Sequence, residues 1–141
     1  MKKVITYGTY DLITPGHIQH LKESKEMGDY LIVGLSTDEF NAIKHKSSYL
    51  SFEERKIVLS SIKYVDEVIP EKDWNQKESD IKKYNIDILT MGSDWQGDDR
   101  FEKLKKCCEV RYTKRPFTWS STAFRKKVDE YINKIEKEYF F

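Results

Sequence analysis

The chain has 141 residues, of which 25 are Lys or Arg and 24 are Asp or Glu, so its net charge is +1 at neutral pH. This length fits one domain with its own core and leaves no room for a separate substrate domain, so we expect residues 1–141 to form a single domain. The even charge balance argues against a nucleic-acid-binding protein. No apolar run has the length of a signal segment or a membrane span, which predicts a cytoplasmic protein without a membrane contact.

Short β-rich runs alternate with helical patterns along the chain. We expect strands at 3–8, 30–36, 66–70, 87–92 and 109–113, and helices at 16–27, 52–62, 75–84, 98–106 and 120–138. Alternation of this kind predicts parallel strands joined by right-handed crossovers, with helices on both faces of the sheet. The expected fold class is therefore α/β, a doubly wound parallel sheet of about five strands.

The last expected helix is longer than a sheet of this kind requires. Its apolar residues recur at helical spacing and are Phe124, Val128, Tyr131, Ile132, Ile135 and Tyr139. Packing against the body of the protein is the ordinary role of such a stripe. A dimer contact or a docking tail stays open as the alternative, because the chain ends in three aromatic residues. We divide the domain into a core, residues 1–125, and a helical extension, residues 126–141.

The junction within residues 4–17 is a strand that stops at a glycine, followed by a turn and the start of a helix. Ligands of parallel sheets bind beyond the carboxyl ends of the strands. A helix start at this edge presents backbone N–H groups and the positive end of the helix dipole, which together hold phosphate. The junction contains neither a P-loop nor a Gly-x-Gly-x-x-Gly dinucleotide motif. His17, in the first helical turn, would lie over the same anion.

Two further segments carry groups that can hold an anion. Ser51 and Glu54 form a capping box, so we expect a helix to begin after Ser51 and Lys44 and Lys46 to lie in the loop before it. These lysines can reach an anion above the sheet, although a charged loop is more often simply solvated. Near the last helix, Arg115 and a cluster of hydroxyl groups can donate to phosphate, with a plain helix cap as the alternative; the hydroxyls belong to Ser120, Ser121 and Thr122.

These segments resemble a known family of enzymes. Residues 8–17 resemble the nucleotidylyltransferase motif Gly-[Thr/Ser]-[Phe/Tyr]-Asp followed by His-x-Gly-His; the matching residues are Gly8, Thr9, Tyr10, Asp11, Gly16 and His17. Residues 36–56, 64–74, 85–87 and 91–95 are similar to the glycerol-3-phosphate cytidylyltransferases, small bacterial enzymes that make CDP-glycerol for teichoic acid and capsule synthesis. The similarity covers about residues 1–125 and implies the Rossmann-like fold of the nucleotidylyltransferases.

The resemblance implies that CMP is transferred from CTP, with its Mg²⁺, to a small phosphorylated alcohol, glycerol 3-phosphate above all, and that pyrophosphate is released. It implies catalytic roles for position 14 and for His17, Lys44 and Lys46. Nucleotide binding is implied for Gly8, Thr9, Tyr10, Asp11, Gly16, Asp94, Trp95, Arg115, Ser120, Ser121 and Thr122, and acceptor binding for Arg55, Lys63 and Trp74. The family also suggests a homodimer. No metal site made by the protein itself is expected.

The chain departs from the family's motifs at two places. Thr14 stands where the first motif has its first histidine, and a threonine carries no charge. Three explanations stay open: a natural variant in which His20 or His45 compensates, an engineered substitution that traps bound substrate, or a domain that binds nucleotide without turnover. The segment 116–119 also differs from the second motif, Arg-Thr-x-Gly-Ile-Ser-Thr-Thr, so base and acceptor preference stay open. An adenylyltransferase of the same superfamily fits the N-terminal motif alone.

Overall fold

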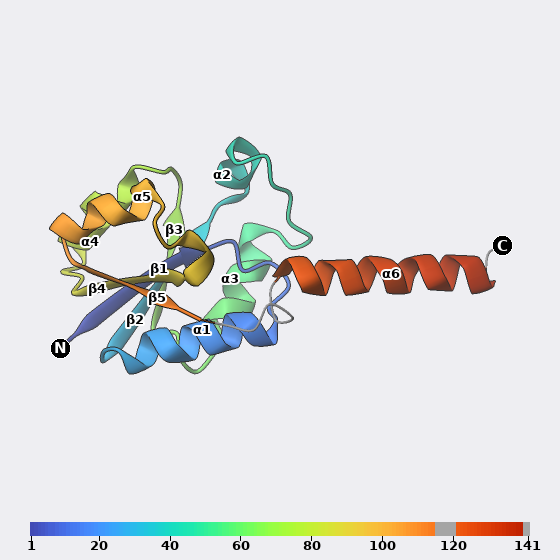
Figure 1. The fold of residues 1–141 in the computed structure, drawn as a ribbon, viewed down its shortest axis with the longest axis horizontal. Helices are drawn as coiled ribbons and strands as arrows, with labels where there is room; N and C mark the ends of the chain where they lie inside the picture. Colours follow the sequence, from blue (N-terminus) through green and yellow to red (C-terminus); the bar gives the residue numbers. More distant parts are fainter. Residues whose placement is uncertain (115–120, 140–141) are drawn as a thin grey trace.

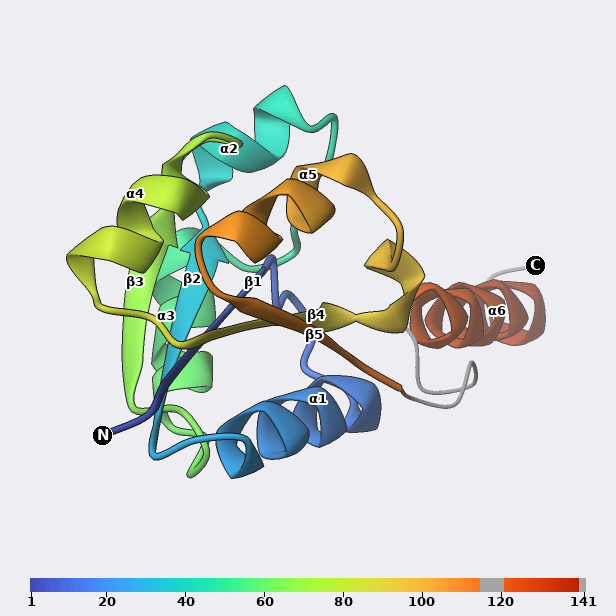
Figure 2. The same cartoon turned by 60° about the vertical axis from the view of Figure 1, so that its left-hand side comes forward.

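A five-stranded parallel sheet with strand order β3-β2-β1-β4-β5 forms the centre of the computed structural model, which describes residues 1–114 and 121–139 (Figures 1 and 2). The strands are β1 (Lys3–Gly8), β2 (Tyr30–Ser36), β3 (Glu67–Glu71), β4 (Ile88–Gly92) and β5 (Glu109–Thr113). The predicted α/β fold class is confirmed. The apolar runs also placed the strands correctly, to within one residue at each end.

Helices cover both faces of the sheet, and each face has its own half of the apolar core. Helices α1 (Pro15–Glu26) and α3 (Phe52–Ser60) contribute Leu21 and Leu59 to one half. Helices α4 (Gln76–Lys83) and α5 (Asp99–Glu102) contribute Ile81 and Phe101 to the other half. A 3₁₀ turn, η2 (Lys103–Lys106), follows α5. Both halves are built on successive strand residues that point to opposite faces.

The segment between β2 and α3 contains a helix that we did not expect, α2 (Asp38–Ile43). The hydroxyl of Thr37 accepts a hydrogen bond from the backbone N–H of Phe40 at 3.1 Å and caps this helix. Lys44 is the capping residue that directly follows α2, so the prediction that Lys44 lies in the segment before α3 is confirmed. The capping box predicted for Ser51 at the start of α3 is confirmed.

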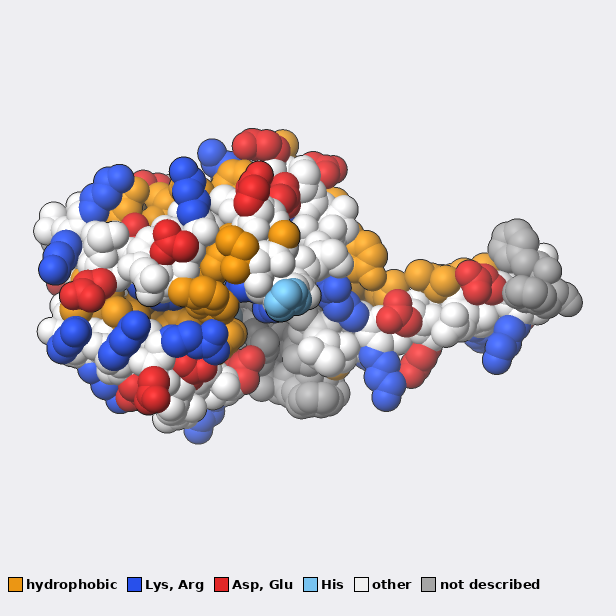
Figure 3. Space-filling model, turned by 90° about the horizontal axis from the view of Figure 1, so that it is seen from above, with side chains coloured by type: hydrophobic (Ala, Val, Ile, Leu, Met, Phe, Trp, Pro, Cys, Tyr) orange, Lys and Arg blue, Asp and Glu red, His pale blue; other side chains and the backbone are white. Residues whose placement is uncertain are grey.

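Helix α6 (Ser121–Tyr139) extends away from the sheet (Figure 1). None of its residues 121–139 is buried, and Tyr131, Ile132 and Tyr139 are 64%, 47% and 74% exposed. Hydrophobic side chains follow one side of this extension (Figure 3). The prediction that the stripe packs on the body of the same chain holds for its first residue, Phe124, and is wrong for Tyr131, Ile132 and Tyr139, because the helix starts at the body and points outward. A contact with a second copy stays a prediction.

Within residues 1–114 and 121–139, no helix combines the length and the apolar character needed to cross a bilayer.

Candidate active site

The carboxyl ends of the parallel strands meet at one edge of the sheet, and most of the predicted site residues follow them directly. Residues 8–17, which we call the cradle, start at the end of β1 and were predicted to hold phosphate. Lys44 and Lys46 follow β2, and Trp74 follows β3. Asp94 and Trp95 lie after β4 in a 3₁₀ turn, η1 (Ser93–Trp95). The topology thus brings residues that are up to 87 positions apart, Gly8 and Trp95, to the same edge.

The cradle after β1 depends on Gly8 and Tyr10. A Cβ atom at Gly8 would lie 2.7 Å from the ring of Tyr10, so only glycine leaves room for that ring. Tyr10 adopts a left-handed backbone conformation with a φ of 45°, and its buried ring lies 5.3 Å from the ring of His17 between centroids. The ring of Tyr10 therefore packs against the ring of His17 and does not point into solvent.

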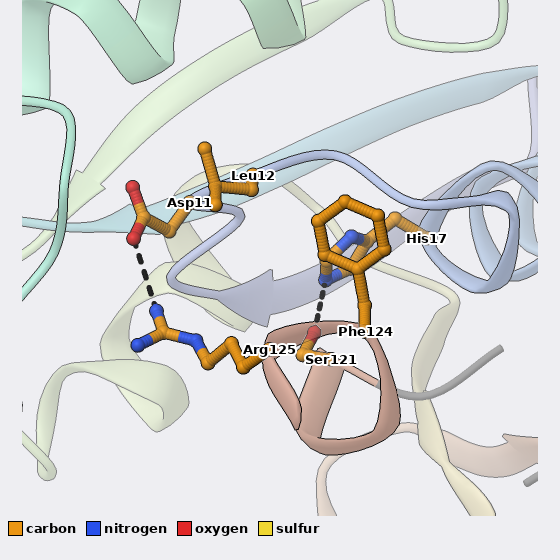
Figure 4. Close-up of a pocket in the computed structure, with 6 residues that line it drawn as sticks. All are labelled: Asp11, Leu12, His17, Ser121, Phe124 and Arg125. Carbon is orange, nitrogen blue, oxygen red and sulfur yellow. Dashed lines mark hydrogen bonds and ion pairs between the residues drawn. The ribbon is translucent and has the colours of Figure 1, made fainter. Parts of the chain in front are cut away.

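His17 is held by the cap of α1. The backbone N–H of Thr14 donates to Nδ1 of His17 at 2.9 Å, and the N–H of His17 donates to the Thr14 hydroxyl at 3.4 Å. Because Nδ1 accepts this hydrogen bond, a neutral His17 carries its own proton on Nε2. Nε2 lies 3.0 Å from Oγ of Ser121, the first residue of α6 (Figure 4). The imidazole thus points its N–H donor at one of the predicted phosphate-binding hydroxyls.

Asp11 joins three segments of the edge. Its carboxylate accepts hydrogen bonds from the backbone N–H groups of Tyr49 and Leu50, at 2.8 and 3.0 Å, and pairs with Arg125 at 3.0 Å. The guanidinium of Arg125 also lies 5.2 Å from the ring of Tyr49. Asp11 was predicted to bind nucleotide; in this structure it fixes the β1 loop, the segment before α3 and α6 relative to one another.

Sequence reasoning missed Arg125. A signal was available, because Arg125 is four residues after Ser121 and so shares its face of the helix. Both side chains line a cavity of about 20 Å³ with Asp11, Leu12, His17 and Phe124 (Figure 4). A space of this size holds about one water molecule. A triphosphate does not fit between His17 and α6 in this arrangement.

Arg55 is fully buried, which corrects its predicted role in binding the acceptor. Nη1 donates to the carbonyl groups of Thr9 and Ser36 at 2.9 and 2.7 Å, and Nε donates to the carbonyl of Leu50 at 3.1 Å. Nη2 pairs with the carboxylate of Asp38 at 2.9 Å. Arg55 therefore holds together the loop after β1, the end of β2 and the segment before α3.

Lys63 lies at the opposite edge of the sheet. It is exposed in the connection between α3, which ends at Ser60, and β3, which begins at Glu67. That connection leads into the amino end of β3, whereas the other site residues follow carboxyl ends. The predicted contact between Lys63 and the acceptor is therefore wrong within a single chain.

Lys44 lies between two aromatic rings at the end of α2. Its Nζ is 4.5 Å from the ring centroid of Phe40 and 5.8 Å from that of Trp74. Burial lowers the pKa of Lys44 to about 8, against the opposing attraction of Glu71. Lys44 thus loses its charge at a lower pH than an exposed lysine does.

Lys46 is exposed and borders a wider hollow of about 360 Å³ between α2 and α3; the other lining residues are Asp38, Asn41, Ser47, Ser48, Leu50 and Ser51. Asn41 is buried, and its Oδ1 accepts hydrogen bonds from the hydroxyls of Thr9 and Ser36. Its amide nitrogen has no partner in the part of the chain that the structure describes. The amide nitrogen of Asn41 is therefore a donor available to a ligand oxygen in this hollow, and the sequence did not suggest it.

The remaining candidates fall into three groups. Trp95 packs edge-on against Phe101, with ring centroids 5.2 Å apart. Thr122 is exposed in the first turn of α6. Arg115 and Ser120 lie outside the described residues, as does the segment 116–119 that departs from the family motif.

The other histidines do not replace a histidine at position 14. His20 is buried between α1 and the sheet, where Nε2 lies 2.8 Å from the hydroxyl of Thr6 and Nδ1 contacts the hydroxyl of Thr113. His45 is exposed in the turn after α2, with a φ of 57°. Thr14 itself is buried and caps α1.

Known proteins resemble the chain over nearly its whole length. The sequence matches the cytidylyltransferase-like family over residues 5–135. It is 57% identical over 128 residues to the glycerol-3-phosphate cytidylyltransferase of Staphylococcus aureus (strain NCTC 8325 / PS 47), covering 91% of this chain and 96% of the relative. It is 53% identical over 128 residues to the enzyme of the same name from Bacillus subtilis (strain 168), covering 91% and 98%.

Among solved structures, the fold is similar to that of the lipopolysaccharide core biosynthesis protein from Thermoplasma volcanium GSS1. The TM-score is 0.69 and the sequence identity 28%, and the match covers 82% of this chain and 97% of the other. The two proteins therefore share their fold, although their sequences are much less similar than those of this chain and the two cytidylyltransferases.

Proposed function

The chain belongs to the cytidylyltransferase-like family, and we propose that it transfers CMP from CTP to glycerol 3-phosphate and releases pyrophosphate. The observation that carries the proposal is the identity of 57% and 53% to two glycerol-3-phosphate cytidylyltransferases over almost their full length. This similarity disfavours both alternatives, a domain without turnover and an adenylyltransferase. The chain is a nucleotidyltransferase.

The proposed reaction needs no covalent bond to the protein. A phosphate oxygen of the acceptor attacks the α-phosphorus of the nucleotide, and the bond from that phosphorus to the pyrophosphate oxygen breaks. Catalysis then consists of positioning the two substrates and stabilising the negative charge that develops between them. The Nε2–H of His17, the ammonium groups of Lys44 and Lys46, and the backbone N–H groups after Gly8 are the donors that this edge supplies.

Mg²⁺ belongs to the nucleotide substrate in this proposal. Within residues 1–114 and 121–139, no group of three or more His, Cys, Asp and Glu side chains is placed to hold a metal ion. We further propose a cytoplasmic enzyme whose product, CDP-glycerol, serves cell-surface polymer synthesis. A homodimer is part of the same proposal, and the exposed apolar stripe of α6 supports it.

Pyrophosphate release by the full chain tests the proposal. We expect release, and formation of CDP-glycerol, only when CTP, Mg²⁺ and glycerol 3-phosphate are all present. Replacing CTP with ATP or UTP is expected to reduce the rate strongly. Absence of pyrophosphate with glycerol 3-phosphate and with every other phosphorylated alcohol would contradict the enzyme proposal.

The pKa of Lys44 predicts a pH dependence. Because Lys44 holds phosphate only while protonated, and its pKa is about 8, its charge is present below this pH and lost above it. An ordinary lysine keeps its charge up to a pKa of about 10.4. We expect kcat/KM to fall about tenfold between pH 7 and pH 9, as follows from titration of one group with this pKa. A Lys44→Arg variant stays charged throughout, so its profile should stay flat over this range; an equal fall in both proteins would assign the titration to another group.

A further inference from the structure

Three cationic side chains surround Trp74, the aromatic residue that follows β3. The guanidinium carbon of Arg100 lies 4.5 Å from a ring centroid of Trp74, Nζ of Lys77 lies at 5.5 Å, and Nζ of Lys44 at 5.8 Å. They come from α5, from α4 and from the end of α2. The indole is half-buried, and its edge packs on Phe40 with ring centroids 5.2 Å apart. Separate parts of the fold thus direct positive charge at one ring.

Arg100 also lies 5.1 Å from the ring centroid of Trp95. Trp74 follows β3 and Trp95 follows β4, and the strands β2 and β1 lie between these two in the sheet. The guanidinium therefore bridges two tryptophans across the edge at which β1 and β2 end. The cradle after β1 and Lys44 after α2 belong to this edge. A phosphorylated acceptor that reaches the nucleotide from the side of Trp74 passes next to Arg100.

Two carboxylates accompany these cations. Asp98 accepts hydrogen bonds from Nε and Nη2 of Arg100 at 3.0 and 2.8 Å, and Glu71 pairs with Lys77 at 2.8 Å. Lys44 has no carboxylate within ion-pair distance among the described residues. The cluster keeps a net positive charge, and the cations, not the carboxylates, are the groups placed against the ring.

The electrostatics of this cluster distinguish between classes of acceptor. An aromatic face attracts cations, and at Trp74 the cations that occupy this position belong to the chain itself. The ammonium group of an amino alcohol would meet the net positive charge of this cluster, in which Lys44 has no carboxylate partner among the described residues, and would have to displace Arg100 to reach the ring. A hydroxyl group meets no such repulsion, and its oxygen can accept hydrogen bonds from a guanidinium or an ammonium group.

We propose that Arg100, with Lys44 and Lys77, makes the acceptor subsite selective for phosphates of neutral polyols and against phosphates of amino alcohols. This inference rests on the proposed function and names its substrate class. Arg100 determines specificity in this proposal, whereas the transfer itself depends on the groups around the cradle.

Two acceptors that differ in one group provide the test. 2-Hydroxyethyl phosphate ends in a hydroxyl, and 2-aminoethyl phosphate has the same length and ends in an ammonium group. We expect the ratio of kcat/KM for these two acceptors, measured by pyrophosphate release with CTP, to favour the hydroxyl strongly in the unmodified protein. Arg100→Gln is expected to narrow the ratio about tenfold, roughly 1.4 kcal/mol, because it removes one of the like charges. Arg100→Lys keeps the charge and should keep most of the ratio.

Arg111 offers a matched control. Like Arg100, it pairs with a carboxylate two residues before it, at 2.7 Å, and the two arginine side chains are 43% and 46% exposed. Arg111 lies on β5, so Arg111→Gln changes the net charge equally without touching Trp74. We expect this variant to leave the ratio unchanged. Raising the salt concentration should narrow the ratio of the unmodified protein, because ions screen an exposed charge but do not alter a steric contact.

Two results would overturn the inference. One is an unchanged ratio in Arg100→Gln, and the other is a preference of the unmodified protein for 2-aminoethyl phosphate. A failure of the proposed function is distinguishable from both, because the unmodified protein would then release no pyrophosphate with glycerol 3-phosphate itself.

Discussion

Thr14→His is expected to release pyrophosphate about 10²–10³ times faster than the unmodified protein, because one missing donor to a developing charge typically lowers the rate by that factor. Thr14 occupies the position of the first histidine in His-x-Gly-His, and its hydroxyl serves the cap of α1. The group that orients His17 is the backbone N–H of residue 14, which the substitution retains. The variant therefore adds a donor without releasing His17.

The same substitution should slightly destabilise the fold. Replacing a capping threonine typically lowers the free energy of unfolding by about 1 kcal/mol, and Thr14 is buried, so a larger side chain must find room next to His17. Thermal unfolding measures this loss separately from the rate. The chain would thus exchange some stability for turnover.

Two further variants show whether the gain has this origin. Thr14→Ser keeps the hydroxyl and the cap, so we expect its rate to equal that of the unmodified protein. In the Thr14→His background, His17→Ala should bring the rate back to a low level, because both donors serve one transition state. A folded Thr14→His variant with no gain in rate would contradict the prediction and would show that the edge already supplies sufficient charge.

The sheet could be predicted because its strands are short apolar runs separated by polar segments. A short apolar run of this kind is typical of a strand in the middle of a parallel sheet, which is buried on both faces. Helix α2 could not be predicted in this way. Only two of its six residues, Phe40 and Asn41, are buried, so no apolar stripe marks it, and its stability depends on the cap at Thr37. For α6 the periodic apolar stripe predicted a helix correctly. Amphipathic spacing shows that a face favours a partner but does not identify that partner.

Predictions for the site depended on whether sequence neighbours stay neighbours in space. The residues from Gly8 to His17 form one continuous segment from the end of β1 to the first turn of α1, so a sequence motif describes their arrangement well. Arg55 and Lys63 are cations eight positions apart, yet one is fully buried under the loops and the other is exposed at the far edge of the sheet. No spacing rule distinguishes these two positions, because most partners of Arg55 come from two distant segments, the loop after β1 and the residues from Ser36 to Asp38.

Arg55→Met is expected to lower the free energy of unfolding by at least about 3 kcal/mol, because three backbone carbonyl groups each lose a donor and each such loss costs about 1–3 kcal/mol. The substitution keeps much of the volume but leaves the carbonyl groups of Thr9, Ser36 and Leu50 without the donor they have in this structure. The Asp38 carboxylate adds less, because it is about half exposed and can be solvated. Urea denaturation of the full chain measures the loss.

Lys56→Met is the matched control for this prediction. Lys56 is the next residue of α3 and is exposed, so its replacement should change stability by less than about 0.5 kcal/mol. If Arg55 instead held the acceptor phosphate, Arg55→Met would raise the KM for glycerol 3-phosphate and leave the unfolding transition in place. The buried guanidinium predicts the opposite: the midpoint of unfolding shifts, and whatever activity is lost follows from loosening of the loops that carry Thr9 and Leu50.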